Sequence, residues 1–155
     1  MQSAFNDLEA FTTKMHLLNI AEKDKIHIKN PFWVICPGSR WENKIYPFEK
    51  LKKLLELVDH PQLVFVTGSC EETKKVLEYY PNALYFEKPK FSALQHLMKD
   101  SELVIGMDSL PIHLSESIGA KTFALFGPSN SSVYFPESER SFVFQGVCPY
   151  NKTFE

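Results

Sequence analysis

The sequence predicts an α/β fold with helices on both faces of a parallel β-sheet. Short apolar runs recur along the 155-residue chain, and segments with the apolar spacing of amphipathic helices separate them. The runs show no alternation of apolar and polar residues, which indicates strands that are buried on both faces. Strands that alternate with helices form parallel sheets through right-handed crossovers. We therefore predict a doubly wound parallel sheet.

A lead-in helix is expected before the sheet. Apolar side chains recur at spacings of three and four residues between residues 6 and 18, and the charged stretch 22–25 is typical of a solvated linker. We therefore predict a lead-in helix and linker over residues 1–24 and one domain over residues 25–155.

Six strands are expected in the domain, with helices between them. The predicted strands are Phe32–Cys36, Leu63–Val66, Ala83–Phe86, Leu103–Gly106, Thr122–Phe126 and Phe142–Phe144. Pro47 suits the first turn of the helix after the first strand, and Pro111 and Gly119 mark the two ends of the helix before the fifth. Ligands of such sheets bind outside the carboxyl ends of the strands, so the loops that follow strands are the candidate functional regions.

Composition and charge exclude several classes of protein. The chain is 44% hydrophobic and 23% charged, as in ordinary globular proteins, and its net charge of −2 argues against a broad nucleic-acid-binding surface. No apolar run approaches the roughly 20 residues that a membrane-spanning helix needs, and the N-terminus shows no secretory signal. The 3 cysteines are far apart in sequence, which favours reduced thiols over a disulfide framework or a zinc site.

The loop after the fourth predicted strand carries the strongest functional signal. Asp108 and Ser109 precede a helix that begins near Pro111, and His113 lies near its first turn. The first backbone N–H groups of a helix lack internal partners and lie at the positive end of the helix dipole, which attracts an anion such as a diphosphate. The simpler interpretation is a capped helix start with an interior histidine.

The loop after the first predicted strand carries two cations. Ser39, Arg40 and Lys44 follow the Pro37-Gly38 turn, on the same edge of the sheet as Ser109. The two cations can neutralise a diphosphate, and the simpler interpretation is a solvated surface loop. The chain has neither a Gly-x-Gly-x-x-Gly sequence nor a Walker-type motif, so we expect neither an ordinary NAD enzyme nor a P-loop kinase.

Two further loops are weaker candidates. Gly68 and Glu72 follow the second predicted strand, where a carboxylate at a helix start can accept hydrogen bonds from ribose hydroxyls. The helix dipole alone also favours an acidic residue in a first turn. The Gly127–Asn130 segment after the fifth strand would let a ligand approach the backbone closely, and a turn without any ligand explains it equally well.

Together these loops resemble the C-terminal domain of glycosyltransferase family 9, the lipopolysaccharide heptosyltransferases. The resemblance covers about residues 17–136 and is carried by Pro37-Gly38-Ser39 with Lys44 and Pro47, Thr67-Gly68, Asp108-Ser109 with Pro111 and His113-Leu114, and Leu125-Phe126-Gly127-Pro128. It implies the Rossmann-like C-terminal half of a GT-B fold. That half would bind ADP-heptose or a related ADP-sugar for an inverting, metal-independent transfer, with no cofactor besides this donor.

The resemblance also assigns roles to single residues. The implied donor contacts are Ser39 and Lys44 at the phosphates, Asp108, Ser109 and His113 near the diphosphate and sugar, Glu72 at the ribose, and Phe91 beside the adenine. Arg40 and Gly68 complete the predicted site. Leu110 stands where the family usually has glycine, which affects how closely the backbone can approach the diphosphate.

The family's general base lies in an N-terminal domain, which we expect to be missing here. We therefore expect no catalytic residue in this chain and no activity from it alone. The implied partners are that domain, the nucleotide-sugar donor and a lipopolysaccharide acceptor, without nucleic acid. The implied location is the cytoplasm, including the cytoplasmic face of the inner membrane.

Two other functions stay open. A non-catalytic nucleotide-binding or interaction module would keep the fold with a degenerate donor site, and Leu110 is the residue that favours it. A hydrolase would use Ser109, His113 and Asp108 together, but the sequence has no Gly-x-Ser-x-Gly elbow.

Overall fold

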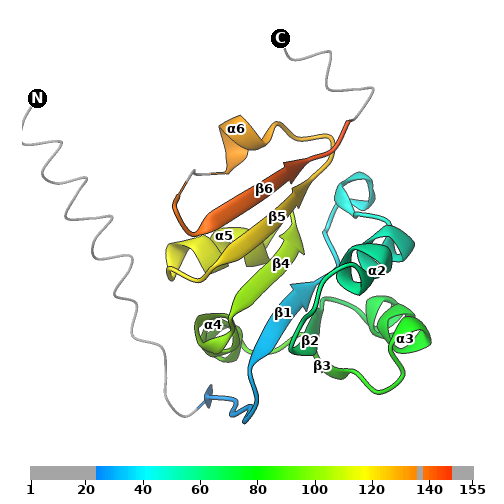
Figure 1. Cartoon of the computed structure of the whole chain (residues 1–155), viewed down its shortest axis with the longest axis vertical. Helices are drawn as coiled ribbons and strands as arrows, with labels where there is room; N and C mark the ends of the chain where they lie inside the picture. The colour runs from blue at the N-terminus through cyan, green and yellow to red at the C-terminus, as the bar shows by residue number, and fades with distance from the viewer. Residues whose placement is uncertain (1–23, 136–137, 148–155) are drawn as a thin grey trace, which may run out of the picture.

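Six parallel strands form the sheet that organises the chain. The computed structural model describes residues 24–135 and 138–147, and within them the strand order is β3-β2-β1-β4-β5-β6 (Figure 1). The strands are β1 (Phe32–Cys36), β2 (Gln62–Thr67), β3 (Leu84–Glu87), β4 (Leu103–Met107), β5 (Thr122–Phe126) and β6 (Ser141–Gln145). All adjacent strands run parallel, which confirms the predicted fold class.

Helices cover both faces of this sheet. They are α2 (Phe48–Glu56), α3 (Cys70–Tyr79), α4 (Phe91–Asp100), α5 (Leu110–Ser117) and the short α6 (Ser131–Tyr134), with a 3-10 helix η2 (Glu42–Lys44) before α2. The helices α2 and α3 lie on one face, and α4 and α5 lie on the other (Figure 1). The sequence did not predict η2 and α6, because a single turn is too short to show a helical period.

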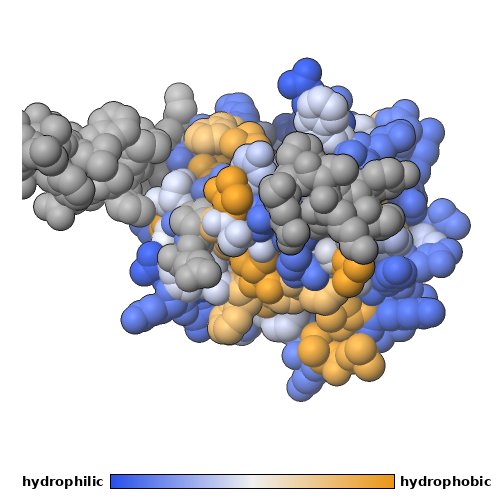
Figure 2. All heavy atoms as spheres, turned by 90° about the horizontal axis from the view of Figure 1, so that it is seen from above, coloured by the Kyte–Doolittle hydropathy of each residue, from blue (hydrophilic) through white to orange (hydrophobic). Residues whose placement is uncertain are grey.

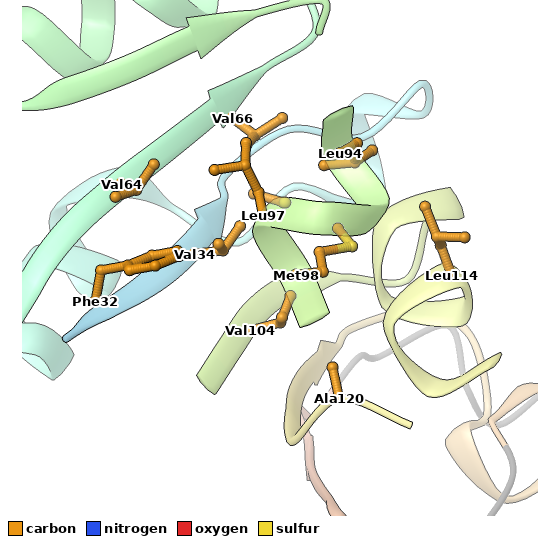
Figure 3. Close-up of a cluster of buried hydrophobic side chains, with 11 residues drawn as sticks. Phe32, Val34, Val64, Val66, Leu94, Leu97, Met98, Val104, Leu114 and Ala120 are labelled. Atoms are coloured by element: carbon orange, nitrogen blue, oxygen red, sulfur yellow. The ribbon is translucent and has the colours of Figure 1, made fainter. Parts of the chain in front are cut away.

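One face of the sheet buries a core against α4 (Figure 3). Val34, Val64 and Val104 of the central strands pack in one cluster with Leu97 and Met98 of α4. All five side chains are completely buried. Truncating such a leucine to alanine costs about 2–5 kcal/mol, because the cavity that is left closes only in part.

The opposite face buries a second core against α2 and α3. Ile35, Phe65 and Met107 point to this side of the sheet, where they pack with Leu51 of α2 and Val76 of α3. Neighbouring residues of one strand thus enter different cores, because successive side chains of a strand point to opposite faces. This explains why the central strands are apolar without alternation.

The order of the strands reverses between β1 and β4. The chain first builds outward from β1 to β2 and β3, and α4 then returns it to β4 on the other side of β1. The ends of β1 and β4 lie side by side, with Cys36 paired to Gly106. A Cβ atom at Gly106 would lie 2.9 Å from Cγ2 of Ile112, so glycine allows α5 to start close to the sheet. The loops after β1 and β4 diverge here, at the usual ligand position of doubly wound sheets.

The edge strand β6 departs from the predicted burial. Phe142 and Phe144 are 64% and 46% exposed, and the other edge strand, β3, alternates half-buried and exposed residues. The expectation that every strand is buried on both faces is therefore wrong for β6 and also for β3. The physical reason is their position, because an edge strand has a neighbour on one side only and the helices of the described residues cover the middle of the sheet.

The segment before β1 is docked on the domain rather than solvated. Asp24 is only 13% exposed, and its carboxylate accepts hydrogen bonds from Lys90 Nζ at 3.1 Å and from Ser92 Oγ at 2.6 Å. Ile26 and Ile28 pack against the core beside α4. The predicted solvated linker is therefore wrong for its last residues, and the lead-in helix lies outside the described residues.

Several predicted boundaries are confirmed. The strands β1 and β5 have the predicted bounds, and Gly119 follows α5 with a φ of +75°, a conformation that favours glycine. Pro47 is the N-cap of α2, one position before the first turn in which it was expected. Over residues 24–135 and 138–147, no helix is long and apolar enough to cross a membrane.

Candidate functional site

A cleft of about 480 Å³ opens at the carboxyl ends of β1, β2, β3 and β4. Six predicted site residues line it, namely Ser39, Arg40, Gly68, Glu72, Ser109 and Leu110. Figure 2 views the molecule from this end, where hydrophobic residues gather across the middle of the surface and hydrophilic residues surround them. The loops after four strands thus converge on one cleft, as the sequence predicts for a doubly wound sheet.

The start of α5 is open on the side of the cleft. Ser109 is the N-cap, but its side chain makes no capping hydrogen bond, and its hydroxyl donates to the carbonyl oxygen of Met107 at 3.3 Å. Pro111 in the first turn has no N–H group. The remaining N–H groups of this turn therefore have no side-chain cap and lie at the positive end of the helix dipole. Such a helix start is suited to an anion.

The start of α3, on the other side of the cleft, satisfies its own N–H groups. Ser69 is its N-cap, and the Ser69 hydroxyl accepts a hydrogen bond from the backbone N–H of Glu72 at 3.2 Å. The carboxylate of Glu72 in turn accepts from the N–H of Gly68 at 2.8 Å. The simpler interpretation of Glu72, an acidic residue at a helix start, therefore holds, and its contact with a ribose stays a prediction.

Gly38 is required by the position of Glu72. A Cβ atom at residue 38 would lie only 2.2 Å from Oε1 of Glu72. The absence of a side chain lets this carboxylate extend from α3 to the loop after β1, where it lies between two walls of the cleft. Gly38 thus leaves room for the Glu72 carboxylate, whether or not a ligand approaches the backbone of the Pro37-Gly38 turn.

Asp108 joins the loops of the site. Its side chain is 7% exposed and pairs with Lys44, with 2.6 Å between Oδ2 and Nζ. Ser129, in the loop after β5, donates a hydrogen bond to the same Oδ2, and Nε2 of His113 lies 3.3 Å from Oδ1. Burial raises the pKa of Asp108, but the hydrogen bonds from Lys44, Ser129 and His113 outweigh burial, and the pKa is lowered overall.

Lys44 lies beside the cleft rather than in its lining. It lines a neighbouring groove of about 450 Å³, together with Tyr46, Lys50 and Phe144. Because Asp108 both contacts Lys44 and precedes Ser109 in the chain, Lys44 and Ser109 lie on either side of the same aspartate. An ammonium group has three N–H donors, so Lys44 can hold Asp108 and still donate to a ligand.

Lys88 is a cleft residue that the sequence did not single out. It follows β3, lines the cleft, and has a φ of 45°, while its N–H donates to the carbonyl oxygen of Thr67 at 2.9 Å. Neither Lys88 nor Arg40 has an ion pair among the described residues. The sequence signal for Lys88 was its place in the loop after the third predicted strand.

Two predicted contacts lie at the periphery. Phe91 is the first residue of α4 and is 52% exposed, but it does not line the cleft. His113 faces Asp108 and is also absent from the lining. Cys36 does line the cleft, and burial together with the charge of Glu72 raises the pKa of its thiol to about 12, which disfavours the thiolate form that a nucleophile needs.

The geometry does not favour a hydrolase. Ser109 would have to donate its hydroxyl hydrogen bond to the His113 ring, but it donates to the backbone of Met107. The ring of His113 contacts Asp108 instead. Among residues 24–135 and 138–147, no group of three or more His, Cys, Asp or Glu side chains is arranged to hold a metal ion.

Comparison with known proteins identifies the family. The sequence model of glycosyltransferase family 9 (heptosyltransferase) matches residues 9–154. The chain therefore belongs to glycosyltransferase family 9. Over 125 residues it is 30% identical to lipopolysaccharide heptosyltransferase 1 of Campylobacter coli, a match that covers 72% of this chain and 36% of that protein. Over 132 residues it is 26% identical to lipopolysaccharide heptosyltransferase 3 of Escherichia coli K12, with 79% and 38% covered.

Solved heptosyltransferases share the fold of this family member. E. coli heptosyltransferase WaaC with ADP aligns with a TM-score of 0.69 at 14% identity, covering 88% of this chain and 42% of that one. E. coli ADP-heptose lipopolysaccharide heptosyltransferase II aligns with a TM-score of 0.64 at 20% identity, covering 82% and 44%. The match thus spans less than half of each relative. The expected resemblance and the expected half of a GT-B fold are both confirmed.

Proposed function

We propose that this chain is the donor-binding part of a heptosyltransferase and that the cleft holds ADP-heptose or a related ADP-sugar. The observation that carries the proposal is the uncapped start of α5, which opens on a cleft that also contains Arg40 and Lys88. A helix start and two cations that have no carboxylate partner among the described residues match the charge of a diphosphate. Family membership makes an ADP-sugar the leading candidate for the ligand.

Residues around the start of α5 bind different parts of the diphosphate. The N–H group of Leu110 donates to one phosphate, the hydroxyl of Ser109 exchanges its bond to Met107 for a bond to the same phosphate, and Arg40 approaches from the loop after β1. Lys44 keeps its bond to Asp108 and turns a second N–H toward the other phosphate. These donors stabilise the negative charge that develops on the departing ADP, which lowers the barrier to transfer. Glu72 receives the ribose hydroxyls, and Phe91 borders the adenine.

The remainder of the reaction requires a second protein part. In this proposal the general base and the lipopolysaccharide acceptor are held by an N-terminal domain, and the sugar is transferred with inversion and without a metal. The described residues then bind and orient the donor and accept its leaving group. We propose that the assembled enzyme works in the cytoplasm or at the cytoplasmic face of the inner membrane, where an ADP-sugar donor is available.

Calorimetry with ADP tests the donor site on this chain alone. Lys44→Ala should weaken ADP binding about ten- to a hundredfold, because losing a charged hydrogen bond costs about 1.5–3 kcal/mol. Lys53→Ala is the matched control, since Lys53 is an exposed lysine in the last turn of α2 and lines neither the cleft nor the neighbouring groove. The proposal is wrong if the parent binds no ADP at millimolar concentration, or if both variants lose the same affinity.

A non-catalytic module remains the second candidate because of Leu110. This side chain is 63% exposed at the first position of α5 and lines the cleft where the diphosphate would approach the backbone. If it blocks that approach, the parent will bind ADP weakly and Leu110→Gly will bind it at least about tenfold more tightly. Equal or weaker binding by Leu110→Gly rejects the degenerate-site alternative.

A further inference from the structure

Three loops that are far apart in the sequence meet at one oxygen atom. Oδ2 of Asp108, after β4, is the acceptor for both Lys44, after β1, and Ser129, after β5. The other carboxylate oxygen, Oδ1, faces the ring of His113 in α5. Besides Lys44, each oxygen of this carboxylate, which is 7% exposed, therefore has one further neighbour: Ser129 at Oδ2 and His113 at Oδ1.

We infer that Ser129 is a positioning residue, which holds the Asp108 carboxylate so that Lys44 is presented to the diphosphate of the donor. The inference rests on the proposed function and adds to it a residue that does not line the cleft. Ser129 acts only through Asp108 and Lys44.

The loop that carries Ser129 is fixed independently of Lys44. Asn130 accepts a hydrogen bond from the N–H of Ser132 at 3.0 Å and so caps α6. Gln145 of β6 spans the loop, because its Oε1 accepts from the N–H of Ser131 at 2.9 Å and its Nε2 donates to the carbonyl oxygen of Gly127 at 2.9 Å. The backbone position of Ser129 is therefore held by its own loop.

A fixed hydroxyl restricts the carboxylate, and the carboxylate restricts the lysine. A lysine side chain has many rotamers, so holding its ammonium group in one place costs conformational entropy. The hydrogen bond from Ser129 to Oδ2 and the His113 ring at Oδ1 limit the rotation of Asp108, and Lys44 meets the same Oδ2. Without Ser129, the ammonium group can take that place on Oδ2 and turn its other donors away from Ser109.

Substitution of Ser129 tests this inference. Ser129→Ala should weaken ADP binding about three- to tenfold, as expected for the loss of one neutral hydrogen bond, and should raise the pH at which the Asp108 carboxyl titrates. Ser129→Thr keeps the hydroxyl and should retain the parent affinity. Ser132→Ala is the matched control, because its hydroxyl bonds only to Asn130 among the described residues. Calorimetry gives the affinities, and NMR of the carboxyl carbon gives the titration.

The outcomes separate this inference from the proposed function. If neither the parent nor any variant binds ADP, the proposed function fails, and the role of Ser129 in it fails as well. If the parent binds ADP and Ser129→Ala binds it equally well, only the inference fails. Equal losses in Ser129→Ala and Ser132→Ala would also overturn it, because the effect would then come from the loop. Should Ser129→Ala not fold, Ser129→Cys replaces it, since a thiol is a weak donor and must give the same loss.

Discussion

The starts of α3 and α5 have nearly the same backbone and opposite consequences. Ser69 and Ser109 are both N-caps, with φ and ψ of −153° and 162° in the first and −159° and 175° in the second. Ser69 accepts a hydrogen bond from its helix, whereas Ser109 makes no cap. One helix start is capped by the side chain of its own serine, whereas the N-cap serine of the other makes no capping hydrogen bond.

The residues around each serine explain the difference. Glu72 lies three positions after Ser69 and returns its carboxylate to Gly68, in a variant of the capping box. Ile112 lies three positions after Ser109 and is buried in the core, so it offers no such acceptor. The acidic residue beside Ser109 is Asp108, whose carboxylate contacts the side chains of Lys44, Ser129 and His113. A serine before a helix therefore indicates a helix start but does not tell whether that start is free to bind an anion.

Removing the charge of Asp108 should have the largest effect on stability. Asp108→Asn breaks the pair with Lys44 in a carboxylate that is 7% exposed, and we expect a loss of about 1.5–3 kcal/mol in the free energy of unfolding. Urea unfolding measures it. The control is Glu71→Gln, which removes the charge of a residue that is exposed in the first turn of α3 and should change stability by less than about 0.5 kcal/mol.

The loss of stability in Asp108→Asn should depend on pH in a defined direction. Because the folded pKa of Asp108 is lowered, the ionised form contributes stability above the unfolded pKa of about 3.9, and this contribution is lost as pH falls through the folded pKa. The difference between the parent and Asp108→Asn should therefore be full at about pH 7 and shrink below about pH 4. A difference that grows in acid contradicts the proposed environment of Asp108.

Adding a side chain at Gly38 should lower the free energy of unfolding by less than the substitution of Asp108 does. In Gly38→Ala the new Cβ collides with the Glu72 carboxylate, which must move and lose its bond to Gly68. We expect a cost of about 1–2 kcal/mol in the free energy of unfolding. The cost should nearly vanish when Gly38→Ala is made in a Glu72→Ala background. An unchanged cost in that background would show that Gly38 serves some other contact.

The smallest effects are expected from replacing Ser69 and Ser109, and they distinguish the two helix starts. Ser69→Ala should cost about 1 kcal/mol of stability through loss of its cap and leave ADP affinity unchanged. Ser109→Ala should change stability by less than about 0.5 kcal/mol and weaken ADP binding about two- to tenfold. Thermal unfolding and calorimetry on the two variants decide the matter. If the two variants exchange these effects, the assignment of closed and open helix starts is reversed.

The sequence predicted the fold better than it predicted the partners within the site. Apolar runs and helix-end residues were sufficient for the strands and for the loops that converge on the cleft, so Ser39, Ser109 and Glu72 were found. Lys88 was missed because the strand before it is short and half-exposed. Ser129 was recognised only as part of a turn, because its bond to Asp108 spans 21 residues and leaves no local pattern.

Local chemistry in the sequence determined which segments form strands and helices, and hence that the candidate site lies at the carboxyl ends of the strands. Only the tertiary structure decided that Lys44 is paired with Asp108 and that α5 rather than α3 begins with a free turn. The reason is physical. Burial periodicity is a property of neighbouring residues, whereas the partner of a charge is chosen by whichever loops the completed sheet brings within hydrogen-bond distance.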